Sequence, residues 1–287
     1  MKKNLLLVLI IMVQSVNITS ATEPITYRLW KNGAPTPNGI APGKEQSDSS
    51  GWITYVSEPE VTVYPAAEPT GAALLMCPGG GYFGLSSLYE GSMLAQPLNE
   101  MGITLAVLKY RMPNGNHEVP REDALRALEI LSENAAELKI DPAKIGIGGA
   151  SAGGHLAATV VSHPGKVTPV FQVLFYPVIT MNEAFTHAGS RNLLLGEKPT
   201  QKLIDYYCNE LHVSPETPPT FIAVSQDDPG VPLKNSTDYF QALMANKVPV
   251  SFHVYPTGGH GWLCQPTFTY RHQAISELTA WLTSLPK

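Results

Sequence analysis

Apolar runs alternate with helical patterns along most of the chain. Segments with apolar residues at helical spacing lie at 121–139, 156–161, 233–246 and 271–282. Short, almost continuously apolar runs, typical of strands buried on both faces, lie at 72–77, 103–110, 145–148, 170–176, 221–225 and 250–255. Buried strands separated by helices indicate an α/β fold with a mostly parallel central sheet and helices on both faces.

Two segments depart from this alternation. Residues 22–60 are rich in Pro, Gly, Ser and Asn, and we expect an extended N-terminal leader with one or two short strands around 53–56. Residues 61–287 then form one domain. Within it, residues 182–218 interrupt the pattern, and an insertion of this length between strands is usually functional. We interpret it as a cap over the site, with a purely structural excursion as the alternative.

The first residues carry the pattern of a secretion signal. Lys2 and Lys3 precede an apolar run from Leu5 to Val13, and the chain then turns polar up to Ala21. This run is too short to span a hydrocarbon core, which needs about 20 apolar residues. Residues 1–21 are therefore predicted to be a signal peptide, and the protein is expected to be secreted or periplasmic without stable membrane insertion.

Composition narrows the classes of function. The chain has 287 residues, 44% hydrophobic and 15% charged, which suits a core-forming protein, and its net charge of −5 gives no reason to expect nucleic acid as a partner. Cys77 is expected to be a buried apolar residue, and Cys208 and Cys264 are expected to stay free although an oxidising compartment would let them pair. No paired His or Cys ligand spacing occurs, so neither a metal nor another cofactor is predicted.

A candidate nucleophile lies after the third of the central apolar runs. The segment Gly149-Ala150-Ser151-Ala152-Gly153 matches G-x-S-x-G, between an apolar run and an Ala-rich helical segment, which is the context this motif requires. Its glycines permit a tight strand-to-helix turn that exposes the hydroxyl of Ser151. A phosphate-binding loop is the alternative, but the G-x-x-x-x-G-K pattern is missing.

A run of glycines follows the apolar run 72–77. Consecutive glycines allow backbone N–H groups to point into a cavity with no Cβ in the way. The amides of Gly80 or Gly81, together with that of Ala152, are therefore candidates for holding the oxyanion of a tetrahedral intermediate. A flexible surface turn is the other interpretation of these glycines.

The candidate base and its orienting acid follow two later apolar runs. Asp228 comes after 221–225 and His260 after 250–255, so the order Ser, Asp, His is the one expected for loops at the carboxyl edge of one parallel sheet. Asp227 is the alternative acid. The remaining histidines are expected to be bystanders: His117, His155, His163, His187, His212, His253 and His272.

These segments together resemble the α/β-hydrolase superfamily, and more narrowly the bacterial acetylesterase and acetyl-xylan or feruloyl esterase-like group associated with xylanases. The resemblance spans about 61–282 and implies a serine carboxylic-ester hydrolase with an acyl-enzyme on Ser151. Pro78 stands where the related hormone-sensitive-lipase group has His, which places the chain outside that group. The motifs are Pro78-Gly79-Gly80-Gly81-Tyr82, Lys109-Tyr110-Arg111, Gly149 to His155, Tyr176-Pro177-Val178, Asp228 to Pro232 and Gly258-Gly259-His260-Gly261.

The resemblance and the signal peptide suggest removal of acetyl or similar short acyl groups from plant polysaccharide such as xylan. The expected partner is a small-molecule or oligosaccharide ester. Tyr82, Phe83 and Trp262 are candidates for stacking on a sugar or feruloyl ring, with packing in the core as the alternative.

Rival functions are less well supported. A serine peptidase of the prolyl-oligopeptidase type would need a large gating domain, for which the residues before 61 are too few. A lipase would need an apolar lid, whereas 182–218 carries several charges. A non-catalytic binding module on a hydrolase scaffold would usually have lost a member of the triad, and all three candidates are present.

Overall fold

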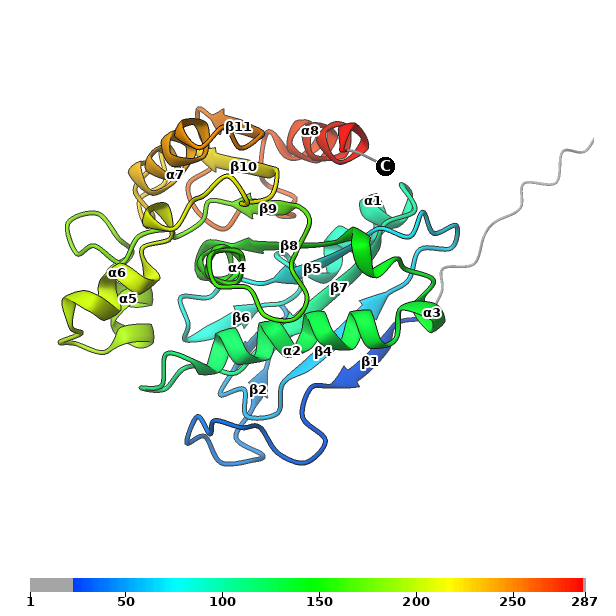
Figure 1. Ribbon diagram of the computed structural model, residues 1–287, viewed down its shortest axis with the longest axis horizontal. Coiled ribbons are helices and arrows are strands. Elements are labelled where there is room, and N and C mark those ends of the chain that lie inside the picture. Colours follow the sequence, from blue (N-terminus) through cyan, green and yellow to red (C-terminus); the bar gives the residue numbers. More distant parts are fainter. Residues whose placement is uncertain (1–22, 286–287) are drawn as a thin grey trace, which may run out of the picture.

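The computed structural model describes residues 23–285 (Figure 1). The predicted signal peptide at 1–21 lies outside the described residues. An eight-stranded sheet forms the centre of the molecule, in the order β1-β4-β7-β5-β8-β9-β10-β11. Its strands are β1 (Ile25–Arg28), β4 (Glu60–Tyr64), β5 (Ala73–Cys77), β7 (Thr104–Lys109), β8 (Ile145–Ala150), β9 (Gln172–Phe175), β10 (Thr220–Ser225) and β11 (Val250–Tyr255).

The sheet is mostly parallel. Neighbouring strands from β7 to β11 are parallel, and β4 alone runs antiparallel to both of its neighbours, β1 and β7. In the middle of the sheet, Leu75 of β5 lies opposite Ala106 of β7 and Ile147 of β8. The six predicted apolar runs coincide with the six parallel strands, so the predicted fold class is confirmed.

Helices cover both faces of the sheet. On one face α2 (Val119–Glu133) contacts α4 (Ser151–Ser162), and on the other α1 (Ala95–Asn99) contacts α8 (Arg271–Ser284). The remaining helices are α3 (Ala135–Leu138), α5 (Ala188–Leu195), α6 (Gln201–Tyr207) and α7 (Lys234–Ala245), with 3-10 turns η1 (Ser92–Leu94), η2 (Pro142–Lys144) and η3 (Asn209–Leu211). Between 23 and 285, no helix has the length and apolar character needed to cross a bilayer.

The helical segment predicted at 121–139 is divided into two helices at Asn134. The chain leaves the helix at Asn134, whose side-chain amide donates to the carbonyl oxygen of Ile130 at 2.7 Å. The short helix α3 follows and ends at Lys139, which has a left-handed φ of 54°. A local side-chain hydrogen bond thus competes with the helical pattern.

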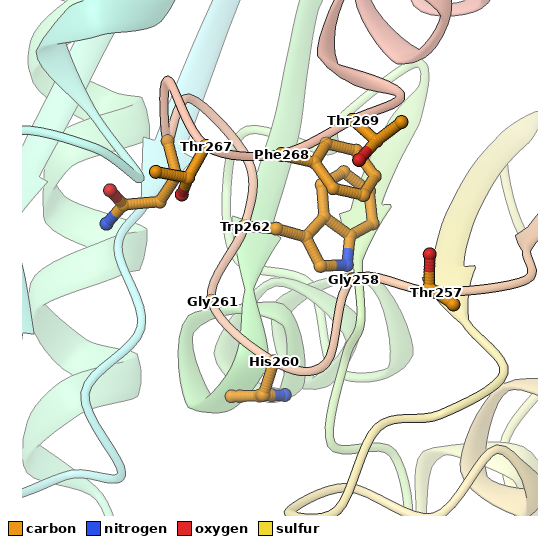
Figure 2. A pocket seen from close by; sticks show the side chains of 9 residues that line it. Thr257, Gly258, His260, Gly261, Trp262, Thr267, Phe268 and Thr269 are labelled. Atoms are coloured by element: carbon orange, nitrogen blue, oxygen red, sulfur yellow. The ribbon is translucent and has the colours of Figure 1, made fainter.

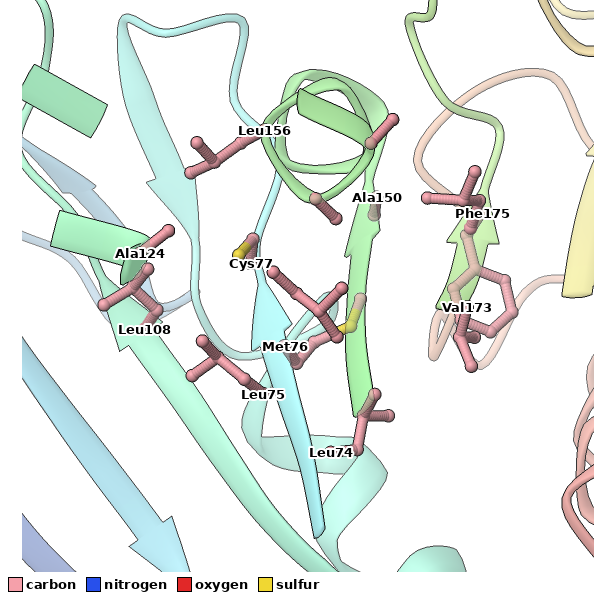
Figure 3. Packing of buried hydrophobic residues seen from close by; sticks show 14 of the residues in the cluster. Leu74, Leu75, Met76, Cys77, Leu108, Ala124, Ala150, Leu156, Val173 and Phe175 are labelled. Atoms are coloured by element: carbon pink, nitrogen blue, oxygen red, sulfur yellow. The ribbon is translucent and has the colours of Figure 1, made fainter. Parts of the chain in front are cut away.

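The core is centred on β5. Every residue of this strand is fully buried, and Figure 3 shows Leu75 and Met76 between Leu108 of β7 and Val173 of β9. Burying a large apolar side chain stabilises the fold by about 1.5–3 kcal/mol. The loops that follow the carboxyl ends of β5, β8, β10 and β11 therefore begin at strands that are held in a well-packed core.

The segment expected to be an extended leader contributes structure to the domain. It supplies β1 to the main sheet, and its β2 (Gln46–Ser47) and β3 (Trp52–Thr54) form a second, antiparallel sheet with β6 (Gly84–Ser86). Trp30 donates its indole N–H to Asp123 of α2 at 2.7 Å. Residues 23–60 are thus packed onto the hydrolase-like domain, and the sequence-based boundary at 60 divides strands of a single sheet.

The insertion 182–218 contains α5, α6 and η3, at the left of Figure 1. Asn235 of α7 holds its first residues, because the amide of this side chain donates to the carbonyl oxygen of Phe185 at 2.8 Å. At its other end, His155 of α4 lies 2.9 Å from the carbonyl oxygen of Tyr207. Both ends of the insertion are therefore tied to helices of the main domain.

All three cysteines are buried and free. Cys208 lies 3.3 Å from the hydroxyl of Thr180, and burial raises the pKa of this thiol. Burial also raises the pKa of Cys264, to about 12. The thiols therefore stay protonated at neutral pH, and the structure contains no disulfide between Cys208 and Cys264.

Candidate active site

Ser151 occupies the sharp turn between β8 and α4. Its φ of 53° is left-handed, a conformation that costs about 1–3 kcal/mol for a residue other than glycine. The flanking glycines are a steric requirement of this turn. A Cβ on Gly149 would lie 2.1 Å from the carbonyl oxygen of Gly153, and one on Gly153 would lie 2.0 Å from that of Cys77. The motif thus has a local steric cause, and it leaves the Ser151 hydroxyl at the carboxyl end of the sheet.

The structure brings Ser151, His260 and Asp228 together. His260 Nε2 lies 2.7 Å from Ser151 Oγ, and its Nδ1 lies 2.6 Å from Asp228 Oδ2. The other carboxylate oxygen of Asp228 accepts the backbone N–H groups of Gly230 and Val231 at 2.8 and 2.9 Å. Because a carboxylate only accepts, Nδ1 carries the ring proton, and Nε2 is free to accept the proton of the Ser151 hydroxyl.

The alternative acid, Asp227, has a different partner. Its carboxylate accepts the backbone N–H of Gly259 at 2.8 Å, and its side chain is exposed. It therefore joins the loop after β10 to the loop that carries His260 without facing the imidazole. Of the two neighbouring carboxylates, the structure places Asp228 on the ring.

The glycine loop after β5 lies directly against the serine. A Cβ on Gly79 would come within 2.9 Å of Ser151 Cβ, and Gly80 and Gly81 have φ values of 136° and 66°. Within 23–285, the N–H groups of Gly80 and Gly81 donate to no protein acceptor. The N–H of Ala152 lies in the first turn of α4, where helix amides lack intrahelical acceptors. The three candidate oxyanion donors thus belong to segments that meet at Ser151.

His187, expected to be a bystander, lies beside this loop. Its Cε1 is 3.8 Å from the position that a Cβ on Gly81 would occupy. Its Nδ1 accepts the backbone N–H of Ser190 at 3.2 Å, which leaves the proton on Nε2. Burial, and secondarily the charge of His260, lower its pKa. The sequence offered one signal for this residue, its position in the insertion interpreted as a cap.

His155 is a structural residue. It is fully buried, accepts the hydroxyl of Tyr82 at Nδ1 (2.8 Å) and donates from Nε2 to the carbonyl oxygen of Tyr207. Burial lowers its pKa to about 4, so the ring is neutral at pH 7. It links the glycine loop to the insertion and does not face Ser151.

The three candidate stacking aromatics differ in exposure. Tyr82 and Trp262 are each only 2% exposed and belong to the core, whereas Phe83 is 53% exposed. Only Phe83, two residues after Gly81, presents its ring to solvent near the glycine loop. Packing in the core therefore accounts for Tyr82 and Trp262, and Phe83 remains the candidate for stacking on a substrate ring.

A cavity of about 290 Å³ adjoins His260 (Figure 2). Figure 2 shows Trp262 and Phe268 on one side of it, and their rings stack at 4.2 Å. Polar side chains complete the lining: Thr257, Gln265, Thr267 and Thr269. Across the part of the chain that the structure describes, no group of three or more His, Cys, Asp or Glu side chains is arranged to hold a metal ion.

Comparisons with known proteins agree with this geometry. The chain is 37% identical over 223 residues to an acetylxylan esterase of Xylanibacter ruminicola and 35% identical over 204 residues to endo-1,4-beta-xylanase B of Butyrivibrio fibrisolvens. The matches cover 76% and 66% of this chain but only 46% and 32% of the relatives, so the chain spans less than half the length of either.

Among solved structures, an acetyl ester-xyloside bifunctional hydrolase from Caldicellulosiruptor lactoaceticus superposes with a TM-score of 0.77 at 32% identity. That match covers 91% of this chain and 96% of the other. The α/β-hydrolase fold family matches residues 74–264, which hold the glycine loop, the serine turn, Asp228 and His260. The chain therefore belongs to the α/β-hydrolase family.

Proposed function

We propose that this protein is a secreted serine esterase that removes acetyl-type groups from a polysaccharide such as xylan through an acyl-enzyme on Ser151. The observation that carries the proposal is the continuous hydrogen-bonded series from Ser151 Oγ to His260 and on to Asp228, at 2.7 and 2.6 Å. A serine hydroxyl is a weak nucleophile, and an adjacent oriented base is what activates it.

Each residue has a defined task in this reaction. Ser151 Oγ attacks the ester carbonyl carbon while His260 Nε2 takes its proton, and Asp228 stabilises the imidazolium that forms. The N–H groups of Gly80 or Gly81 and of Ala152 donate to the oxyanion. His260 then protonates the departing alcohol, leaving the acyl group on Ser151. A water molecule then gives a proton to His260 and attacks the acyl carbon; the bond to Ser151 Oγ breaks, His260 returns the proton to Oγ, and the acid leaves.

The substrate class rests on two kinds of support. The similar proteins named above include an acetylxylan esterase and an acetyl ester-xyloside hydrolase. The insertion 182–218 carries several charged residues, whereas the site of a lipase for long acyl chains would need an apolar lid. Export is proposed from the sequence pattern of residues 1–21.

The test is a panel of substrates given to the wild type and to Ser151→Ala. We expect the wild type to hydrolyse p-nitrophenyl acetate and to release acetate from acetylated xylo-oligosaccharide, with little action on long-chain esters or a peptide anilide. Methyl ferulate tests the feruloyl alternative. Ser151→Ala should lose activity by about 10⁴-fold or more with an unchanged melting temperature, while Ser162→Ala, at the far end of the same helix, should match the wild type.

Cleavage of the anilide would favour a peptidase. Inertness toward every substrate would favour a binding module. The proposed export has a separate test, because the mass of protein recovered outside the cytoplasm should correspond to a chain that begins at Thr22. Recovery of the full-length chain only in the cytoplasm would contradict it.

A further inference from the structure

One buried carboxyl group near the active site has no part in the mechanism above. Glu90 lies between β6 and η1 and is 4% exposed. Its Oε2 accepts the backbone N–H of Gly79 at 2.8 Å, and its Oε1 accepts the hydroxyl of Tyr176 at 2.8 Å. Buried carboxylates are costly unless they are paired or hydrogen-bonded, so this placement calls for an explanation.

One partner of Glu90 belongs to the glycine loop, and the other, Tyr176, follows β9 and contacts the loop that carries His260. Gly79 begins the glycine loop, and a Cβ there would lie 2.6 Å from Glu90 Oε2. The hydroxyl of Tyr176 accepts the N–H of Leu263 at 3.2 Å, and its ring meets the ring of His260 edge-on at 4.8 Å. A single carboxyl group therefore connects the oxyanion side of the site to the histidine side.

The hydrogen bonds favour the ionised form of Glu90. Each oxygen receives one donor, and a carboxylate accepts at both oxygens with no proton of its own to place. Burial raises the pKa of Glu90, and the bond from Tyr176, the positive charge of His260 and the N–H of Gly79 act in the opposite direction. Tyr110 and Cys264 also face Glu90, and burial keeps both of them protonated.

His260 is thus faced by charged or titratable groups from several elements. Asp228 bonds to its Nδ1, Tyr176 packs on its ring, His187 approaches from the insertion, and Glu90 approaches from beneath the glycine loop. Of these, Asp228 and Glu90 are the two carboxyl groups. Only the role of Asp228 is expected from the triad.

We infer that Glu90 is a positioning residue for the ester hydrolysis proposed above, on which this inference rests. Its carboxylate holds the Gly79 loop and the His260 loop at a fixed separation. It also supplies a second negative charge that stabilises protonated His260 in the transition state. Both effects stabilise the transition state, in which the imidazolium and the oxyanion exist together.

Glu90→Gln is the central test, because it removes the charge and keeps the shape. We expect kcat for p-nitrophenyl acetate to fall about tenfold with KM within about twofold, since the interaction acts in the transition state. The acid limb of the pH profile should move to lower pH, because protonated His260 loses a neighbouring negative charge. The control is Glu100→Gln, exposed at the end of α1, which should leave both quantities unchanged.

Tyr176→Phe should shift the profile in the same direction as Glu90→Gln but less far. It keeps the ring on His260 but removes the hydroxyl that donates to Glu90. The carboxylate loses a stabilising donor and takes up a proton at higher pH, so less negative charge faces protonated His260 and the acid limb should move downward. In the double variant Glu90→Gln/Tyr176→Phe the loss of the hydroxyl should add no further shift, because no carboxylate is present. A merely structural role would give lower activity in all variants with no shift of the acid limb.

A measurement without substrate separates this inference from the proposed function. The ring of His260, identified by NMR against His260→Gln, should take up its second proton at lower pH in Glu90→Gln than in the wild type. This difference between the two proteins is expected even if neither of them hydrolyses an ester. An unchanged His260 titration in a variant with wild-type melting temperature would overturn the inference, as would wild-type kcat and an unshifted pH profile.

Discussion

Asp227 and Asp228 are neighbours in the chain, yet their carboxylates bond to different parts of one loop. Asp228 bonds to the imidazole of His260 at 2.6 Å, and Asp227 accepts the backbone N–H of Gly259, one residue earlier. One carboxylate therefore orients the ring, and the other holds the backbone on which the ring is carried. The pair fixes the His260 loop at two points.

The two aspartates should respond differently to the same substitution. Asp228→Asn replaces an acceptor of the Nδ1 proton by a group that favours the wrong tautomer, and kcat should fall by about 10⁴-fold. Asp227→Asn keeps an acceptor for Gly259 and should change kcat by less than about threefold. Steady-state kinetics on p-nitrophenyl acetate measure both. The reverse order of effects would contradict the assignment of Asp228 as the acid.

Sequence patterns predicted the parallel strands because those strands are buried on both faces and read as continuous apolar runs. They missed β4, where buried residues alternate with partly exposed ones, and β1, whose pattern over Ile25–Arg28 is weaker still. Short strands at or beside the edge of a sheet take their stability from pairing, which composition does not reveal. The same cause explains why residues 22–60 were expected to be a leader.

The candidate site shows a similar division. Ser151, Asp228 and His260 were expected together because each follows an apolar run, and parallel strands end at one edge. Glu90 follows no such run, and its two partners lie 11 and 86 residues away in the sequence. Its contacts to Gly79 and Tyr176 emerge only when these residues are placed in space.

Gly153→Ala tests the steric origin of the serine turn. An added Cβ would lie 2.0 Å from the carbonyl oxygen of Cys77, a backbone atom at the end of β5 that has little freedom to move. We expect the variant to lose about 1–3 kcal/mol of unfolding free energy and most of its activity, because the glycine loop begins immediately after Cys77. The control is Gly165→Ala, whose Cβ would meet only the flexible end of Leu125. Urea unfolding and initial rates measure both.

Phe83→Ala tests the exposed ring beside the glycine loop. If the ring stacks on a sugar of the substrate, its removal should raise KM for acetylated xylo-oligosaccharide by about five- to tenfold, a loss of about 1 kcal/mol. KM for p-nitrophenyl acetate, which has no sugar, should change by less than twofold. Equal effects on both substrates would indicate a role in the shape of the loop. The control is Leu211→Ala, because Leu211 is also an exposed apolar residue. Phe240→Ala is not equivalent, because the ring of Phe240 packs against Phe252.

The buried pair Arg111–Asp123 should be important for stability. Asp123 is fully buried and accepts from the guanidinium of Arg111 at 2.7–3.1 Å and from Trp30 of the N-terminal segment. Asp123→Asn removes the buried counter-charge of the guanidinium and leaves only Glu122, at 3.8 Å, so the expected cost is about 3–5 kcal/mol. Asp238→Asn, in a surface pair with Lys234, should cost less than about 1 kcal/mol. Thermal and urea unfolding compare them, and equal costs would contradict the prediction.

Acid should destabilise the protein through His155. Its folded pKa of about 4 lies below the ordinary value of 6.5, so between these pH values the unfolded chain binds a proton that the folded chain does not. The unfolding free energy should therefore fall as pH drops from about 6.5 to 4, by about 3 kcal/mol, and this contribution should level off below pH 4.

Carboxyl groups titrate over part of the same range, so the prediction concerns a difference between two proteins. His155→Gln keeps polar atoms near Tyr82 and Tyr207 but has no proton to gain. Its stability at pH 7 should be lower than that of the wild type, and its loss between pH 6.5 and 4 should be smaller by about 3 kcal/mol. Urea titrations at several pH values supply both curves. Parallel curves would mean that His155 takes up its proton as readily in the folded protein as in the unfolded chain.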